Sequence, residues 1–204
     1  MRNRLSRKKL FVGVTGGIGS GKTLVCSYLE ELGCKIFYAD ELARRMYLTS
    51  KELRTALVKE FGKTILDKKN NISFDRLRQI VFSSEKNQKR VNNIVHPFVI
   101  AELIRRAKSD KSKIIIVEAA LIFESGFDKY LDLTVEIFSS VKTRVERVKK
   151  RKKLTVSQIK SIIKLQMPEN EKTRRADFVI KNHSSKMDLR KKVQFLYFIL
   201  NQLL

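Results

Sequence analysis

A glycine-rich segment close to the start of the chain restricts its possible folds more than any other feature. Residues 16–23 have the sequence Gly-Gly-Ile-Gly-Ser-Gly-Lys-Thr, which fits the pattern G-x-x-x-x-G-K-[ST]. The apolar run Leu10–Thr15 stands before it and predicts a buried strand, and residues 22–32 after it have the apolar spacing of a helix. A strand, a glycine-rich turn and a helix in this order predict a phosphate-binding loop, or P-loop, in a parallel α/β fold.

The composition of this segment suits the binding of a nucleoside triphosphate. Glycine lets the backbone curl tightly, so that successive N–H groups point at the phosphates, and the following helix directs its positive end toward them. Lys22 can reach the β- and γ-phosphates, and the hydroxyl of Thr23 can bind Mg²⁺. We therefore expect ATP and Mg²⁺ as cofactors, bound by the following residues: Gly17, Ile18, Gly19, Ser20, Gly21, Lys22 and Thr23.

Further apolar runs along the chain extend the predicted sheet. They are Lys35–Asp40, Ile114–Phe123, Leu133–Phe138 and Phe178–Ile180. Because helical stretches separate these runs, we predict a three-layer α/β fold with a five-stranded parallel sheet. The core of this single domain should comprise residues 1–48, 112–140 and 175–204.

Two mostly helical stretches interrupt the alternation of strands and helices. Residues from about 49 to 111 lack a strand pattern, and we expect them to form a helical insert that binds the acceptor. Within the insert, Pro97 should kink or split a helix beside His96. Residues from about 141 to 174 are basic, and Thr155 and Gln158 among them have the spacing of a capping box. We expect this second stretch to form a lid.

Charge and composition narrow the class of protein. The 204-residue chain has 44 Lys and Arg against 21 Asp and Glu, a net charge of +23. This excess predicts weak, salt-sensitive binding of nucleic acid, but no specific nucleic-acid partner. The apolar runs are far shorter than the roughly 20 residues of a membrane span, and no signal peptide is visible. Cys26 and Cys34 make no disulfide framework, so we expect reduced buried thiols in a cytoplasmic protein.

The P-loop pattern alone leaves the reaction open. An Asn/Thr-Lys-x-Asp motif for guanine recognition is absent from the sequence, and the chain is small for a motor or a helicase. A short chain with a helical insert and a basic segment favours a small-molecule kinase, whose lid keeps water from accepting the phosphoryl group. A nucleoside monophosphate kinase and a nucleic-acid-binding ATPase remain alternatives on the residues alone.

Six motifs spread over nearly the whole chain resemble those of the dephospho-coenzyme A kinases. They are Val14–Thr23, Ala39–Arg44, Val95–Pro97, Leu121–Glu124, Gln166–Pro168 and Arg175–Asn182, in the order in which the family has them. The resemblance implies ATP-dependent phosphorylation of the ribose 3′-hydroxyl of dephospho-coenzyme A, the last step of coenzyme A synthesis.

The resemblance also implies roles for single residues. With Lys22, the catalytic residues would be Asp40, which matches the carboxylate that meets the acceptor hydroxyl, and Arg151, which matches a lid arginine that closes on the ATP phosphates. The lysines on either side of Arg151 offer substitutes for it. Asn182 matches a residue beside the adenine, although an asparagine after a strand is also typical of a turn. The acceptor side would be formed by Thr15, Asp40, Arg44, His96, Leu121 and Glu124. A histidine before a proline is equally typical of a structural hinge.

The chain departs from the family pattern mainly on the acceptor side and in the lid. The substituted positions are Tyr38, Ile100, Glu118, Ala120 and Lys152, where the family usually has Asp, Arg, Asp, Pro and Asp, respectively. The residues that carry the expected chemistry, Lys22, Thr23 and Asp40, are all present. We therefore expect catalysis to be preserved and the affinity for the acceptor to be altered.

Overall fold

The structure is a computed structural model that describes residues 9–151 and 154–204. It consists of two compact units, one formed by the chain up to Tyr38 and from Ser109 onward, the other by Ala39–Lys108. The second unit overlaps the helical insert predicted for residues 49–111, but it begins earlier. Strand β2 (Lys35–Tyr38) passes directly into helix α2 (Ala39–Thr49), which packs against helix α3 (Lys51–Phe61) of the second unit.

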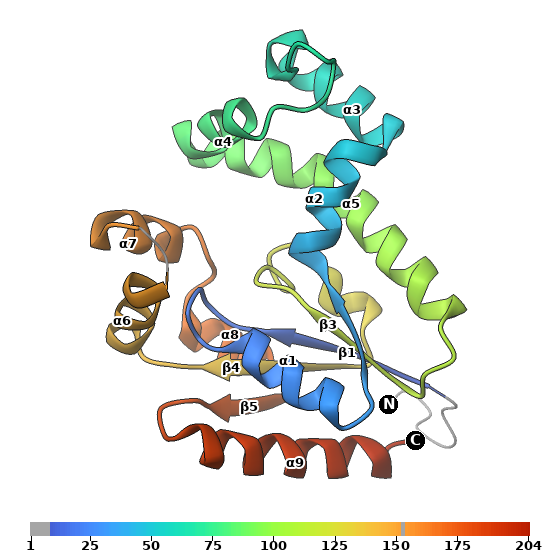
Figure 1. Cartoon of the computed structure of the whole chain (residues 1–204), viewed down its shortest axis with the longest axis vertical. Coiled ribbons are helices and arrows are strands. Elements are labelled where there is room, and N and C mark those ends of the chain that lie inside the picture. Colours follow the sequence, from blue (N-terminus) through green and yellow to red (C-terminus); the bar gives the residue numbers. More distant parts are fainter. Residues whose placement is uncertain (1–8, 152–153) are drawn as a thin grey trace. The chain divides into compact units, whose positions relative to one another are not determined.

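The first unit is built on a five-stranded sheet in the order β2-β3-β1-β4-β5 (Figure 1). Every pair of neighbouring strands is parallel. Besides β2, the strands are β1 (Leu10–Thr15), β3 (Ile114–Glu118), β4 (Leu133–Phe138) and β5 (Phe178–Lys181). The predicted parallel α/β sheet is therefore confirmed.

Each face of this sheet is covered, because alternate side chains of the strands point to opposite sides. Val12 and Val14 of β1 belong to a buried cluster with side chains of helices α1 (Lys22–Glu31) and α9 (Lys186–Gln202), which pack against each other. On the other face, Ile122 and Leu131 lie against Gly13 of β1, and helix α8 (Glu169–Arg175) contacts β4. These layers fix the ends of the strands, where the P-loop begins.

Two strands are shorter than the sequence pattern predicts. The prediction that a strand runs over Lys35–Asp40 is wrong at its end, since Asp40 lies in the first turn of α2. An aspartate there interacts favourably with the positive end of the helix. The predicted strand Ile114–Phe123 likewise ends at Glu118, and the chain then turns: the amide of Ser125 donates to the carbonyl of Leu121 at 3.0 Å.

The segment predicted as a lid forms helices α6 (Val141–Arg151), α7 (Val156–Lys164) and α8. Thr155 caps α7 as predicted. Its hydroxyl accepts from the amide of Gln158 at 3.2 Å, and the Gln158 side chain accepts from the amide of Thr155 at 2.9 Å. Among the described residues, none of the helices is both long and apolar enough for a membrane span.

The second unit consists of α2, α3, a short 3₁₀ turn (Lys63–Ile65), α4 (Phe74–Ser83) and α5 (Glu85–Ser109). Of the two outcomes expected at Pro97, a split of the helix is wrong, because α5 continues through it, and a kink stays a prediction. The residues that hold α5 together across the proline form one buried stripe with a four-residue spacing. They are Val91, Val95, Val99, Leu103 and Ala107.

Candidate active site

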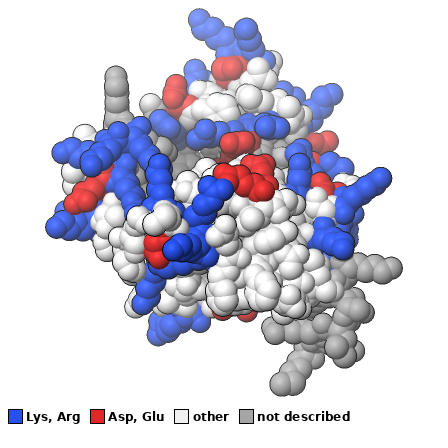
Figure 2. Space-filling model, turned by 60° about the horizontal axis from the view of Figure 1, so that its bottom comes forward, with Lys and Arg blue, Asp and Glu red and all other residues white. Residues whose placement is uncertain are grey.

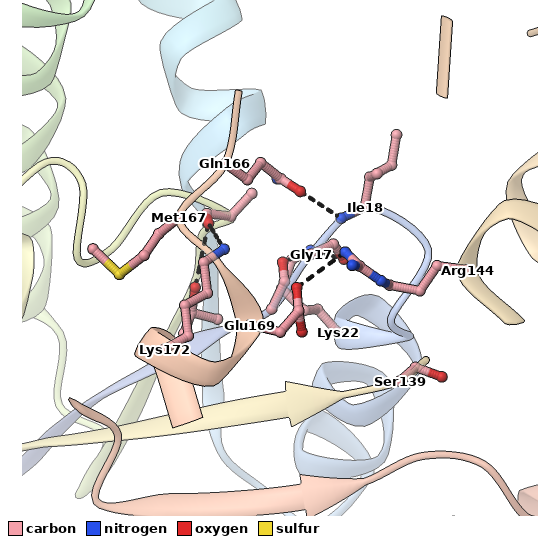
Figure 3. A network of polar contacts seen from close by, with 12 residues as sticks. Gly17, Ile18, Lys22, Ser139, Arg144, Gln166, Met167, Glu169 and Lys172 are labelled. Atoms are coloured by element: carbon pink, nitrogen blue, oxygen red, sulfur yellow. Dashed lines mark hydrogen bonds and ion pairs between the residues drawn. The ribbon is translucent and has the colours of Figure 1, made fainter. Parts of the chain in front are cut away.

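The P-loop connects β1 to α1 (Figure 3), and three of its glycines, including Gly16 with φ of +150°, have backbone conformations that other residues rarely adopt. Gly19 has φ of +78° and Gly21 has φ of +102°, both in the left-handed region. A side chain at position 19 would also collide with the backbone of Arg144, since the carbonyl oxygen of Arg144 lies 2.7 Å from the place of a Cβ. Gly21 caps α1, so the positive end of this helix faces the loop.

Lys22 and Thr23 lie in the first turn of α1, where the sequence pattern predicts phosphate and metal contacts. The Lys22 ammonium donates to the carbonyl of Gly16 at 2.9 Å, which places it beside the loop. The Thr23 hydroxyl donates to Oε1 of Glu118 at 3.0 Å. Because β3 is the neighbour of β1, its last residue, Glu118, brings a carboxylate next to the threonine.

Asn182 and Arg147 both donate hydrogen bonds to the backbone of the P-loop at Ser20. The side-chain amide of Asn182 donates to the carbonyl of Ser20 at 2.7 Å, and Arg147 donates to the same carbonyl at 3.3 Å. Arg147 also donates to the carbonyl of Asn182 at 3.2 Å. Asn182 is buried against Gly21, so its observed contacts support the loop. Its predicted contact with adenine stays a prediction.

The turn after β3 carries two of the predicted acceptor-side residues, and a third, Thr15 at the end of β1, contacts this turn. The Thr15 hydroxyl donates to the carbonyl of Ala120 at 3.4 Å, and Leu121 lies next to it in the turn. Glu124 accepts from the amide of Met167 at 2.7 Å and lies 3.4 Å from the ammonium of Lys172. The structure thus brings Thr15, Leu121 and Glu124 into one region of the first unit.

Several charged side chains are buried beside the P-loop (Figure 3). Arg144 of α6 forms an ion pair with Glu169 of α8 at 3.0 Å, and the arginine side chain is only 1% exposed. Lys172, also on α8, is fully buried and lies between Glu124 and the carbonyl of Ala120. Buried charges of this kind are concentrated at functional sites.

Glu136 is a buried carboxylate on β4, beside Thr15 in the strand register. Burial, and to a smaller degree repulsion from the neighbouring Glu169, raise its pKa to about 8, although the positive charges of Lys172 and Lys22 act in the opposite direction. The surroundings of this group therefore favour its protonated form.

Gln166 reaches the P-loop from the segment between α7 and α8. Its side-chain oxygen accepts a hydrogen bond from the amide of Ile18 at 3.0 Å, and Figure 3 shows the Gln166 side chain pointing at the backbone nitrogen of Ile18. The backbone N–H groups of a P-loop are the donors that phosphate oxygens use. Gln166 therefore engages one of the predicted nucleotide contacts directly.

Three predicted acceptor-side residues belong to the second unit. Asp40 and Arg44 lie one turn apart on α2, both exposed, and His96 is half-buried on α5. Tyr47 of α2 has its pKa raised to about 12, chiefly by burial and to a smaller degree by the charge of Asp40. The roles of Asp40, Arg44 and His96 stay predictions.

Arg151, the predicted lid arginine, is the last residue of α6 and is exposed. Its charge helps to lower the pKa of Arg147, although burial of Arg147 is the larger cause. Lys152 and Lys153, which the sequence offers as substitutes for Arg151, lie outside the described residues.

Comparisons with known proteins match this arrangement to one family. A family model described as dephospho-CoA kinase matches residues 10–188. The chain belongs to the dephospho-CoA kinase family. It is similar to the dephospho-CoA kinase of Fusobacterium nucleatum, with 36% identity over 91% of this chain and 95% of that protein. The dephospho-CoA kinase of Salinibacter ruber is 35% identical over the same shares of the two chains.

Solved structures agree with membership of the dephospho-CoA kinase family. The dephospho-CoA kinase of Campylobacter jejuni has a TM-score of 0.67 and 27% identity, covering 95% of this chain and 98% of that one. A Thermus thermophilus protein has a TM-score of 0.80 and 28% identity, covering 95% and 99%. A shikimate kinase of Acinetobacter baumannii, at 17% identity and a TM-score of 0.55, shares the fold.

Sequence reasoning about this member of the dephospho-CoA kinase family missed the buried charges around the P-loop. One signal was available, since Glu136 interrupts an otherwise apolar strand pattern. Arg144 and Lys172 gave none, because an arginine or lysine within a basic helical segment is usually a solvated side chain. Only the packing of α6 and α8 shows that these two residues are inside.

Replacing Glu136 by glutamine should stabilise the fold more at high pH than at low pH. The folded-state pKa of Glu136 is raised, so its folding penalty is absent below the ordinary pKa of about 4.5, grows as the pH rises to about 8, and is constant above that. Glu136→Gln removes a penalty on the order of a few kcal/mol at pH 9. Thermal unfolding midpoints from pH 5 to pH 9 test this. A midpoint difference between variant and wild type that does not grow with pH would contradict it.

Replacing Arg151 by alanine should slow transfer to the acceptor more than it weakens ATP binding. The charge of a lid arginine counts most when the site is closed and dry, because electrostatic interactions are stronger there. Single-turnover rates and ATP affinity of Arg151→Ala separate the two effects. If only a combined replacement of the lysines around Arg151 lowers the rate, the assignment to this one residue is wrong.

Proposed function

We propose that this chain transfers the γ-phosphoryl group of ATP to the ribose 3′-hydroxyl of dephospho-coenzyme A. The observation that carries the proposal is the P-loop with Lys22 at the start of α1, in a chain that belongs to the dephospho-CoA kinase family. Transfer is direct and in line. The protein contributes positioning and stabilisation of charge more than covalent chemistry.

Each part of the proposed site has its own role in the reaction. The P-loop amides and Lys22 hold the phosphates, and Arg151 neutralises charge on the transferring group. Asp40 accepts a hydrogen bond from the acceptor hydroxyl and orients it. Dephospho-coenzyme A is bound by Thr15, Arg44, His96, Leu121 and Glu124. Asn182 lies on the adenine side of ATP. Residues 141–174 form the lid, with residues 39–108 as the acceptor-binding unit.

The residues at the start of α1 fit a magnesium ion bound with the nucleotide. The Thr23 hydroxyl and the Glu118 carboxylate lie 3.0 Å apart, and both are oxygen ligands of the kind Mg²⁺ prefers. In the described residues, no group of three or more His, Cys, Asp and Glu side chains could hold a metal. Mg²⁺ in kinases is usually held by one or two protein groups together with phosphates and water. When bound, the ion would neutralise charge on the phosphates.

Analogues of the acceptor test the proposed reaction directly. Dephospho-coenzyme A whose adenosine lacks the 3′-hydroxyl should not be phosphorylated, whereas the analogue lacking the 2′-hydroxyl should be. Both analogues keep the rest of the acceptor, so the comparison isolates the reacting group. Phosphorylation of the 3′-deoxy analogue at the wild-type rate would overturn the proposed regiochemistry.

The proposed setting of the reaction is the cytoplasm, where ATP and reduced thiols are found. Cys26 and Cys34 are free and buried, and burial raises the pKa of Cys34 to about 12, which keeps it a thiol. Lys and Arg side chains gather at the left, top and right of the face shown in Figure 2, with Asp and Glu among them and an uncharged area at its lower centre. We propose that this positive charge causes weak, salt-dependent binding of polyanions, without a specific nucleic-acid partner.

A further inference from the structure

We propose that Arg144 and Glu169 form a positioning pair that sets the shape of the P-loop at Gly17 and couples helices α6 and α8 to it. This inference rests on the proposed function, and it adds two residues to the phosphoryl-transfer machinery. Neither residue belongs to the P-loop pattern, and they come from helices on either side of α7.

The first observation is the closeness of the pair to Gly17. A Cβ at position 17 would overlap Nη1 of Arg144, and it would lie 2.6 Å from Oε1 of Glu169 and 2.8 Å from Cζ of Arg144. The φ angle of Gly17 lies outside the left-handed region, unlike those of Gly19 and Gly21. Position 17 therefore requires glycine because of the ion pair, whereas positions 19 and 21 require it because of the backbone.

The second observation is that the pair has little freedom to move away. Arg144 is 1% exposed and Glu169 is 16% exposed, and their ion pair measures 3.0 Å. The backbone of Arg144 also contacts the loop, with its carbonyl oxygen 2.7 Å from the place of a Cβ on Gly19. Arg144 thus touches the P-loop at two of its glycines, once through the guanidinium and once through the main chain.

The third observation is that further contacts join the same two segments to the P-loop. Arg147, one turn after Arg144, donates to the carbonyl of Ser20, and Gln166, shortly before Glu169, accepts from the amide of Ile18. Both ends of the proposed lid therefore form hydrogen bonds with the P-loop. The Arg144–Glu169 ion pair, drawn in Figure 3, connects these two ends to each other.

The physical consequence concerns the phosphates. P-loop amides must converge on them, and a misplacement of about 1 Å can cost on the order of 10²-fold in rate. A buried arginine and glutamate that fill the space beside Gly17 prevent the loop from relaxing in that direction. Their opposite charges also cancel, so that neither adds an uncompensated buried charge beside the phosphate site.

Epistasis between Gly17 and the ion pair tests the proposal. Gly17→Ala is introduced into the wild type, into Arg144→Lys, and into a chain with Arg144→Met and Glu169→Leu. The Met/Leu pair removes both charges and the three atoms nearest Gly17, while filling similar volume. The Arg144→Lys variant keeps a positive charge opposite Glu169 but lacks Nη1. It replaces the Met/Leu chain in the comparison if that chain does not fold.

Lys142→Met, an exposed change on α6, is the control. Calorimetric ATP affinity, kcat and KM with dephospho-coenzyme A, and thermal unfolding are measured for each.

We expect Gly17→Ala to weaken ATP binding at least about tenfold in the wild type but less than about threefold in the Met/Leu chain, with an intermediate loss in Arg144→Lys. The Met/Leu chain itself should lose about 10- to 100-fold in kcat/KM for ATP. An equal cost of Gly17→Ala in all three chains would overturn the proposal, as would wild-type ATP affinity and kcat in the Met/Leu chain. Failure of the proposed function has a different signature: the wild type would bind ATP and leave dephospho-coenzyme A unphosphorylated.

Discussion

Asp40→Asn is expected to slow phosphoryl transfer by about 10²–10⁴-fold while ATP still binds. A ribose hydroxyl is a poor nucleophile at neutral pH, so it must be oriented toward the γ-phosphorus and must lose its proton. A carboxylate can accept that hydrogen bond, and asparagine keeps the shape of the side chain without the charge. Asp40 follows β2 by two residues, and in parallel α/β sheets ligands bind beyond the carboxyl ends of the strands.

Tyr38→Phe is the matched control for Asp40→Asn. Tyr38 is the last residue of β2 and packs against the buried cluster of the sheet, and a phenol is a poorer catalytic base at neutral pH than a carboxylate. Its replacement should therefore change the rate far less. Single-turnover transfer and ATP affinity in both variants decide the matter. A large loss in Tyr38→Phe with little loss in Asp40→Asn would show that the acceptor contacts another side chain.

Lys22→Ala is expected to lower the transfer rate by about 10²-fold or more, because it removes a fixed positive charge where negative charge develops. The ammonium lies 2.9 Å from the carbonyl of Gly16, beside the loop that we propose encloses the phosphates. The fold should persist, since the buried cluster of the sheet does not include this side chain. Circular dichroism and thermal unfolding provide the control. A folded Lys22→Ala protein with full activity would remove Lys22 from the mechanism.

Much of the fold was predictable because the strands are buried and the P-loop has a fixed pattern. Leu10–Thr15 and Leu133–Phe138 have the predicted bounds, since each is an apolar run that ends at a turn or a helix. The end of β2 was not predictable from its apolar pattern, because Ala39 and Asp40 fit either a strand or a helix start. The continuation of α5 through Pro97 was not predictable for a similar reason: local propensity favours a kink or a break, and the buried stripe of α5 keeps the helix continuous.

The site was predictable where a residue sits in a local motif, and not where packing between distant segments creates it. The position of Lys22 and Thr23 at the start of α1 follows from the P-loop pattern alone. The Arg144–Glu169 pair joins two helices, and no spacing of residues in the sequence predicts it. The pKa of Glu136 likewise depends on burial and on Glu169, which stands far along the chain. Long-range electrostatics of this kind requires the tertiary structure.

The most direct test of the proposed function is a panel of acceptors. ATP consumption is measured with dephospho-coenzyme A, AMP, CMP and shikimate under identical conditions, and the phosphorylated product is identified by mass spectrometry. We expect rapid turnover with dephospho-coenzyme A alone, with coenzyme A as the product. An inert dephospho-coenzyme A together with turnover of another acceptor would contradict the proposed function.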